Sequence, residues 1–453
     1  MGKTAADADP SGLMFSNQDL KKMIIPLFFE QLLVLLVGII DTFMISSAGE
    51  AAVSGVSLVN SFSAIFLYLF TALASGGAVV VSQYIGSGQK ENSKESAGQL
   101  LMISTAVSLV IMGAVLLGGR GMLTALFGRV EEDVMQACVT YLWISALSYP
   151  ALAVYNAGAA LYRSLGDTQT TMVVSILSNI INVAGNYIGV FVLKAGVAGV
   201  AWPTFAARMF SAVVITWLAY RKKHEIYYEN KYIFRWNGGL LKRILRVAVP
   251  NGLEGTIFQF VKVVLSSIVA LFGTYQIAAN GVAQSIWSLA ALTGIAMGPV
   301  FVTVIGQCMG AGDSAQAEMY FKKLMKISIV FAVAWNALIL AGTPLLLRYY
   351  NLGEETKTLI FQLVIIHNVF CAFVSPFTQL GNGLRAAGDI KFTMITSIVA
   401  TLAVRLVFSY ILGQWLAWGV IGIAVAMCMN WIASAIAYIV RLKSGKWKQF
   451  KII

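Results

Sequence analysis

One aspartate inside an apolar stretch is the first candidate for chemistry. Asp41 stands in "LLVGIIDTFMIS", and farther along "SNIINVAGN" supplies Asn182 and Asn186, four residues apart. Residues at this spacing share one face of a helix. A carboxylate, two amide oxygens and a hydroxyl such as that of Thr204 form an all-oxygen site suited to Na⁺, and the carboxylate alone suits a proton. The alternative is that these groups are interhelical hydrogen bonds that hold the helices together.

The remaining ionisable residues of the apolar stretches are few. Two acids, Glu30 and Glu254, each follow a proline by four residues, and the one histidine is His367. The acids are either first-turn residues favoured by the helix dipole or acids at the mouth of a cleft, and His367 is a further candidate for the cleft wall. Three bases also lie in these stretches: Arg208, Lys262 and Arg405. They either pair with acids or extend toward the membrane surface.

Two polar stretches match each other between the apolar ones. Residues 161–172 read "LYRSLGDTQTTM" and residues 383–394 read "GLRAAGDIKFTM", and the two align without a gap. The matched pairs are Arg163 with Arg385, Gly166 with Gly388, and Asp167 with Asp389. Arginine suits the last turn of a helix, glycine lets the chain reverse, and aspartate suits the N-cap of the next helix. We interpret each stretch as a cytoplasmic hairpin turn; the alternatives are a gate that rearranges as the halves move, or a substrate site.

Membrane-spanning helices are expected to position all these residues. Hydrophobic residues make up 58% of the 453 positions and charged residues 11%, whereas a soluble domain carries about 25% charged residues. Apolar runs of roughly 19–29 residues recur, each long enough to cross the ~30 Å hydrocarbon core, and none alternates like a barrel strand. The expected spans are 23–46, 56–84, 100–118, 135–161, 169–192, 198–219, 246–271, 281–309, 324–346, 358–383, 391–413 and 419–440. The predicted fold class is therefore an all-α integral membrane protein with twelve transmembrane helices.

The twelve helices form two similar halves. "VVSQYIGSG" (81–89) matches "VIGQCMGAG" (304–312), and "GVAGVAWPT" (196–204) matches "GVIGIAVAM" (419–427), both at the same separation along the chain. Six crossings give both halves the same orientation, so we expect two six-helix bundles related by a pseudo-twofold axis along the membrane normal. The expected segments are a tail (1–20), an N-lobe (21–220), a linker (221–245), a C-lobe (246–440) and a second tail (441–453).

The candidate ion site has no counterpart in the second half. Asp41 matches Leu265, and the two asparagines match Val404 and Phe408. A group that belonged only to the repeated scaffold would be expected in both halves. The asymmetry therefore favours a functional role for Asp41.

The basic residues indicate the orientation of the chain. Most of the 32 lysines and arginines lie in the two tails and the loops on their side of the membrane. The opposite loops hold only Arg120, Arg129, Lys194, Arg348 and Lys357. Loops rich in lysine and arginine stay on the cytoplasmic side of a membrane. We therefore expect a protein of the plasma membrane with both termini in the cytoplasm. The net charge of +12 is thus explained by topology and attraction to anionic lipids, and no nucleic-acid partner is expected.

Motifs for catalysis are missing from the sequence. It has no G-x-x-x-x-G-K-[ST] phosphate loop, no metal-ligand cluster and no nucleophile motif, so we expect neither an enzyme nor a cofactor. The four cysteines follow no metal-binding spacing and are expected to pack as small apolar residues. The first 20 residues lack the pattern of a cleaved signal peptide, so the first helix is expected to serve as an uncleaved anchor. An ion gradient is the energy source that remains.

Taken together, the motifs resemble the multidrug and toxic compound extrusion (MATE) family over almost the whole chain after residue 20. They are Asp41 followed by Thr42, "QYIGSGQ", "LYRSLGDTQTTM", "NVAGN", "GVAGVAWPT" and "GLRAAGD". The resemblance implies a Na⁺- or H⁺-coupled antiporter that exports lipophilic, often cationic drugs by alternating access. It places the cation site of the N-lobe on Asp41, Asn182, Asn186 and Thr204. Certain sodium-coupled members of the family carry an acid in the tenth helix. This sequence lacks it, and Val374 lies near the matching position.

The resemblance also implies small organic cations and membrane lipids as partners, and a monomer. One alternative is a related two-lobed flippase of lipid-linked oligosaccharides, which would line its cleft with several cations. A membrane receptor or an intramembrane enzyme is a more distant alternative. A receptor needs no six-plus-six repeat, and an enzyme needs a paired catalytic constellation that the sequence lacks.

Overall fold

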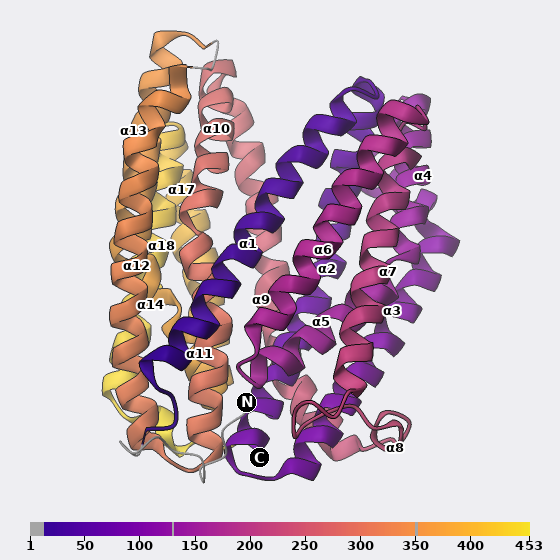
Figure 1. Ribbon diagram of the computed structural model, residues 1–453. Coiled ribbons are helices and arrows are strands. Elements are labelled where there is room, and N and C mark those ends of the chain that lie inside the picture. Colours follow the sequence, from indigo (N-terminus) through magenta and orange to yellow (C-terminus); the bar gives the residue numbers. More distant parts are fainter. Residues whose placement is uncertain (1–12, 129–130, 349–351) are drawn as a thin grey trace. The chain divides into compact units, whose positions relative to one another are not determined.

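The computed structural model describes residues 13–128, 131–348 and 352–453, and all its regular elements are helical (Figure 1). Eleven helices of this described part are long and apolar enough to cross a bilayer, and a bent pair makes a twelfth span. The prediction of an all-α membrane protein with twelve spans is confirmed. Residues 1–12 of the expected N-terminal tail and Arg129 lie outside the described residues.

The chain divides into two compact units, residues 16–252 and 253–453, the second of which also takes in Phe15. The helices that lie wholly within the first unit are α1 (Asn17–Ser46), α2 (Glu50–Gly86), α3 (Lys90–Phe127), α4 (Glu132–Leu147), α5 (Tyr149–Ser164), α6 (Thr168–Tyr187), α7 (Ala198–Tyr220) and α8 (Asn230–Ile233). Helices α4 and α5 meet at a bend of 44° and together form the fourth span. α6 continues as a π-helical turn over Ile188–Val192. Helix α9 (Gly238–Val269) runs from the first unit into the second.

The second unit contains the matching set of helices. They are α10 (Thr274–Ala290), α11 (Leu292–Gly310), α12 (Ser314–Arg348), α13 (Glu354–Phe373), α14 (Ser375–Thr378), α15 (Leu380–Ala386), α16 (Ile390–Val399), α17 (Val407–Tyr410) and α18 (Val420–Lys443). The expected span 358–383 is too long, because α13 ends at Phe373, before Pro376. Proline lacks the amide hydrogen that the helical ladder needs at its position.

Helix starts follow from local capping chemistry. Ser16 and Asp19 form a capping box at the start of α1: the Ser16 hydroxyl accepts from the Asp19 amide, and the Asp19 carboxylate accepts from the Ser16 amide. α1 therefore begins at Asn17, several residues before the expected span. Each unit has its own apolar core, with Tyr149 and Leu142 among the buried residues of the first, and Ile360 and Val364 among those of the second.

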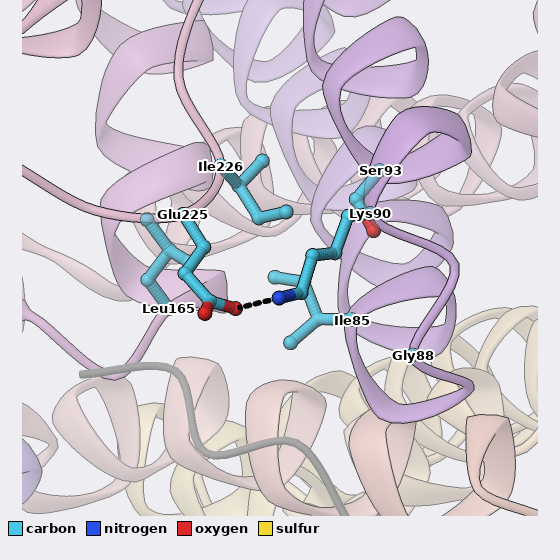
Figure 2. Close-up of a pocket in the computed structure, with 7 residues that line it drawn as sticks. All are labelled: Ile85, Gly88, Lys90, Ser93, Leu165, Glu225 and Ile226. Atoms are coloured by element: carbon cyan, nitrogen blue, oxygen red, sulfur yellow. Dashed lines mark ion pairs between the residues drawn. The ribbon is translucent and has the colours of Figure 1, made fainter. Parts of the chain in front are cut away.

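The stretch between α7 and α9, which covers most of the expected linker, packs against α3 of the first unit. Lys94 of α3 binds Glu229 at 3.0 Å, and the Gln99 amide donates to the Tyr232 carbonyl at 2.7 Å. Figure 2 shows a second attachment, an ion pair between Lys90 and Glu225 at 3.0 Å. The pocket beside this pair has about 10 Å³ of space, enough for roughly one water molecule and too little for an organic ligand.

Candidate ion site and the repeated turns

Close packing of α6 on α7 brings the polar residues of the first unit together. A Cβ added at Gly185 would lie 2.6 Å from the Pro203 Cβ, and one added at Gly189 would lie 2.1 Å from the Gly199 carbonyl oxygen. Only glycine permits such an approach. Asn186 follows Gly185 and Thr204 follows Pro203, so this contact sets the spacing of the site.

The four predicted residues form one hydrogen-bonded chain across α1, α6 and α7. The Asn186 amide nitrogen donates to Asp41 Oδ1 at 2.7 Å and to Asn182 Oδ1 at 3.2 Å. The Asn182 amide nitrogen donates to the Thr204 hydroxyl at 3.0 Å. Both asparagines are buried, whereas Asp41 and Thr204 are half-buried. The structure thus brings together the residues that the sequence singled out.

Within this hydrogen-bonded group, the side chains of Asn182 and Asp41 approach each other with two oxygen atoms. In one orientation of the Asn182 amide, its oxygen lies 3.0 Å from Asp41 Oδ1, and both atoms are acceptors when Asp41 is ionised. If the amide is turned over, its nitrogen lies 3.2 Å from the Asn186 amide nitrogen, and two donors face each other. In addition, Asn186 Oδ1 is buried without a hydrogen-bond partner in the described part of the chain. A proton on Asp41, or a cation among these oxygens, removes the conflict.

An apolar groove lies between α1, which carries Asp41, and α6, which carries the two asparagines. It has a volume of about 590 Å³ and is lined by Leu33, Val37, Met44, Ile176, Asn179, Ile180, Val183, Ala184, Tyr187 and Ile188. Asp41 stands four residues after Val37, on the same face of α1. A groove of this size suits a drug-sized apolar molecule.

Glu30 is not a first-turn acid, because α1 begins at Asn17 and Glu30 lies deep inside the helix. Its carboxylate accepts from the Arg163 guanidinium at 2.6 Å and from the Thr171 hydroxyl at 3.0 Å. Its side chain is 4% exposed. Arg163 does lie in the last turn of α5, but it binds this carboxylate of α1.

The second unit repeats this ion pair at the matched positions. Glu254 of α9 pairs with Arg385 of α15 at 3.4 Å and accepts from the Ser397 hydroxyl at 2.7 Å. Here too the acid lies well inside its helix, so the first-turn interpretation is wrong for both glutamates. Each polar turn is thereby fixed to the first helix of its own half.

The two aspartates of the turns have different partners. Asp167 is the N-cap of α6, where its carboxylate accepts from the Thr170 amide at 3.1 Å, and Gly166 reverses the chain at a φ of 77°. This confirms the cap predicted from the sequence. Asp389 makes no side-chain cap and instead binds Arg441 of α18 at 2.6 Å. Gly388, at a φ of 102°, reverses the chain there as Gly166 does in the first half.

We expect Asp167→Ala to lower the free energy of unfolding by about 0.5–2 kcal/mol near neutral pH, the value of one N-cap. Burial raises the pKa of Asp167, but hydrogen bonds from His224 and Thr170 outweigh it and lower the pKa to about 2. A depressed pKa stabilises the fold above the unfolded value of 3.8, and the contribution is lost as the pH falls through 2. The deficit of the variant should therefore be smaller at pH 3 than at pH 7. Thermal unfolding of both proteins at these pH values measures it, and an equal deficit at both would contradict the assignment.

The remaining predicted residues lie apart from the ion site. His367 of α13 is 1% exposed, and neither ring nitrogen has a hydrogen-bond partner among the described residues. Like Glu30, it is buried within its own unit in this structure. Arg208 of α7 donates to the Ser148 hydroxyl at 2.7 Å, whereas Lys262 of α9 is exposed.

The glycines that set the contact between α6 and α7 were not among the residues predicted from the sequence. Gly185 and Gly189 form a G-x-x-x-G pattern one turn apart, a known signal of close helix packing in membranes. In "NVAGN" the glycine stands directly before Asn186. This pattern is the signal that would have identified them.

A family model described as MatE matches residues 26–188 and 250–411. These two segments fall in the two halves recognised from the internal repeat.

Two curated relatives match over nearly their full length. The uncharacterised transporter YisQ of Bacillus subtilis (strain 168) is 26% identical over 94% of this chain and 93% of its own. The probable multidrug resistance protein NorM of Thermotoga maritima is 21% identical over 96% and 94%. Among solved structures, an outward-facing multidrug resistance MATE family transporter superposes with a TM-score of 0.88 at 19% identity, over 94% of this chain and 96% of that one. This last likeness concerns the fold.

Proposed function

The chain belongs to the MatE family, whose members are transporters rather than enzymes, and we propose that it is an antiporter that exports lipophilic organic cations in exchange for Na⁺ or H⁺. The observation that carries the proposal is the chain of Asp41, Asn182, Asn186 and Thr204. A proton on Asp41 or a cation among these oxygens would relieve the close contact between the Asn182 and Asp41 side chains. The ion is the coupling partner, and no other cofactor is proposed.

The apolar groove supports the class of substrate. The groove lies between α1 and α6, and Asp41 follows its lining residue Val37 by one turn of α1, so we place a bulky apolar cation against Val37 and Ile180 with its charge toward the carboxylate. A carboxylate that serves the ion and the drug in turn makes their binding mutually exclusive. This competition converts an inward ion gradient into outward drug movement by alternating access. The multidrug relatives named NorM favour this function over a lipid-linked oligosaccharide flippase.

Reconstituted vesicles give a direct test of the proposed function. The purified protein is placed in liposomes with a fluorescent lipophilic cation, and either a Na⁺ gradient or a pH gradient is imposed. We expect one of the two gradients to drive the dye across the membrane against its own gradient. Failure of both, with correctly folded protein, would contradict the proposal.

We further propose that the protein acts as a monomer in the plasma membrane, with both termini in the cytoplasm. The four native cysteines are buried, so introduced cysteines report on sidedness. An impermeant maleimide should label Arg120→Cys in intact cells and should label Asn230→Cys only after the membrane is opened. Strong labelling of Asn230→Cys in intact cells would show the opposite orientation.

A further inference from the structure

A second apolar groove lies in the second unit, along α12 and α18 and over the short helices α14 and α15. It has a volume of about 440 Å³. Helices α12 and α18 both pack against α14 and α15, which form the floor of the groove (Figure 1). The apolar side chains that line it are Phe321, Met325, Ile329, Val330, Phe377, Leu380, Ile439 and Leu442. Val330 is 63% exposed, so the groove is open at the surface of the unit.

Lysines gather toward one end of this groove. Lys322 and Lys326 lie one turn apart on one face of α12, Lys443 lies in the last turn of α18, and all three are exposed. The one acid of the lining, Glu318, binds Lys322 at 3.0 Å and Lys448 at 2.6 Å, so its charge is shared between two cations. Within the described part of the chain, no carboxylate pairs with Lys326 or Lys443. This end of the groove therefore keeps a surplus of positive charge beside apolar walls.

The first half covers the matching turn of its own third span. Helix α3 is the counterpart of α12 in the repeat, and its Gln99 amide donates to the carbonyl of Tyr232 in α8 at 2.7 Å. A Cβ added at Gly98 would lie 3.1 Å from the Tyr232 carbonyl carbon. In the second half, the chain after α18 places Trp447 against Phe321, and the groove beside them stays open. The repeated scaffold therefore does not require the groove to be open.

Charge and surroundings together identify the ligand. Helices α12 and α18 are long and apolar enough to cross the bilayer, so an open apolar groove along them meets acyl chains. The lysines repel an organic cation, and a free inorganic anion would leave the apolar walls unfilled. Basic pockets between membrane helices bind acidic lipid head groups.

We propose that this groove binds one anionic phospholipid. An acyl chain lies along Ile329 and Phe377, and the phosphate lies at the lysines, which extend their apolar stems along the groove and their charges toward the membrane surface. The proposal does not depend on the exported substrate or on the ion that binds at Asp41.

The test is the melting temperature of the purified full-length protein in a neutral detergent, as phosphatidylglycerol is added at constant pH and constant Na⁺. We expect a saturable rise of about 1–3 °C, because a ligand that binds only the folded state stabilises it. Phosphatidylcholine with the same acyl chains and glycerol 3-phosphate alone should give no rise at the concentration that saturates with phosphatidylglycerol. Transport is not measured, so failure here is distinct from failure of the transport proposal.

Three outcomes of this titration would overturn the lipid site. The first is a melting temperature that is independent of phosphatidylglycerol. The second is an equal rise with phosphatidylcholine, which would show that the lysines do not select the head group. The third is an equal rise with glycerol 3-phosphate, which would show that the apolar groove takes no part in binding.

Two double variants assign the effect to the groove. Lys326→Gln combined with Lys443→Gln removes two of its charges and should raise the phosphatidylglycerol concentration at half-saturation at least about tenfold. Lys242→Gln combined with Lys391→Gln removes two exposed lysines that do not line the groove, and should leave that concentration unchanged. All four lysines are exposed, so both variants are expected to fold. An unchanged response in the first variant, or an equal loss in the second, would show that the lipid binds elsewhere or through net charge alone.

Discussion

Asp41→Asn is expected to abolish gradient-driven export while leaving a folded protein in the membrane. The substitution keeps the volume of the side chain but removes its charge and its titratable proton. The new amide can also donate toward the Asn182 oxygen, which lies 3.0 Å from Asp41 Oδ1. The variant therefore resembles the protonated site in its hydrogen bonds, and its stability should equal or exceed that of the wild type.

Two measurements separate loss of coupling from loss of folding. Dye export in reconstituted vesicles under the driving gradient should fall to the level of protein-free vesicles, while the melting temperature is retained. Glu50→Gln is the matched control, since Glu50 is an exposed acid in the first turn of α2 and its neutralisation should leave export unchanged. Near-normal export by Asp41→Asn would show that Asp41 is not the coupling residue.

The clustering of Asp41 with the two asparagines was predictable because these residue types are unusual where they occur. An aspartate and a pair of asparagines stand out in apolar stretches, and the i, i+4 spacing places Asn182 and Asn186 on one face. The spans were predictable from hydropathy, and the Asp167 cap from its position before α6. Each of these signals is local in sequence.

Pairings between distant helices were not predicted, although one of them had left a signal. Both halves carry a glutamate in their first helix and an arginine in the turn after the fourth span, at closely matching places of the repeat. Duplication of opposite charges at matched places indicates an ion pair. From the sequence, each arginine was instead placed at the end of its own helix, and each glutamate was left either in a first turn or at a cleft mouth. Long-range pairing overrides such local preferences because a buried carboxylate needs a cation more than a helix end does.

Glu30→Gln is expected to cost about 3–5 kcal/mol of unfolding free energy, because it breaks the short ion pair that the buried Glu30 carboxylate makes with Arg163. The matched substitution Glu254→Gln should cost less. Glu254 is 22% exposed and 3.4 Å from Arg385, whereas Glu30 is 4% exposed and 2.6 Å from Arg163. The two variants thus compare the loss of the same ion pair at a buried glutamate and at a more exposed one.

Thermal or chemical unfolding in detergent measures both variants, and Glu132→Gln, which removes the partner of Arg120 in an exposed pair, is the surface control. Combining Glu30→Gln with Arg163→Met should recover part of the loss, since an uncompensated buried charge is worse than an apolar pair of similar size. If Glu30→Gln is as mild as Glu132→Gln, the ion pair does not hold the turn against α1. If the double variant is less stable than Glu30→Gln alone, the main contribution of Arg163 is something other than balancing the charge of Glu30.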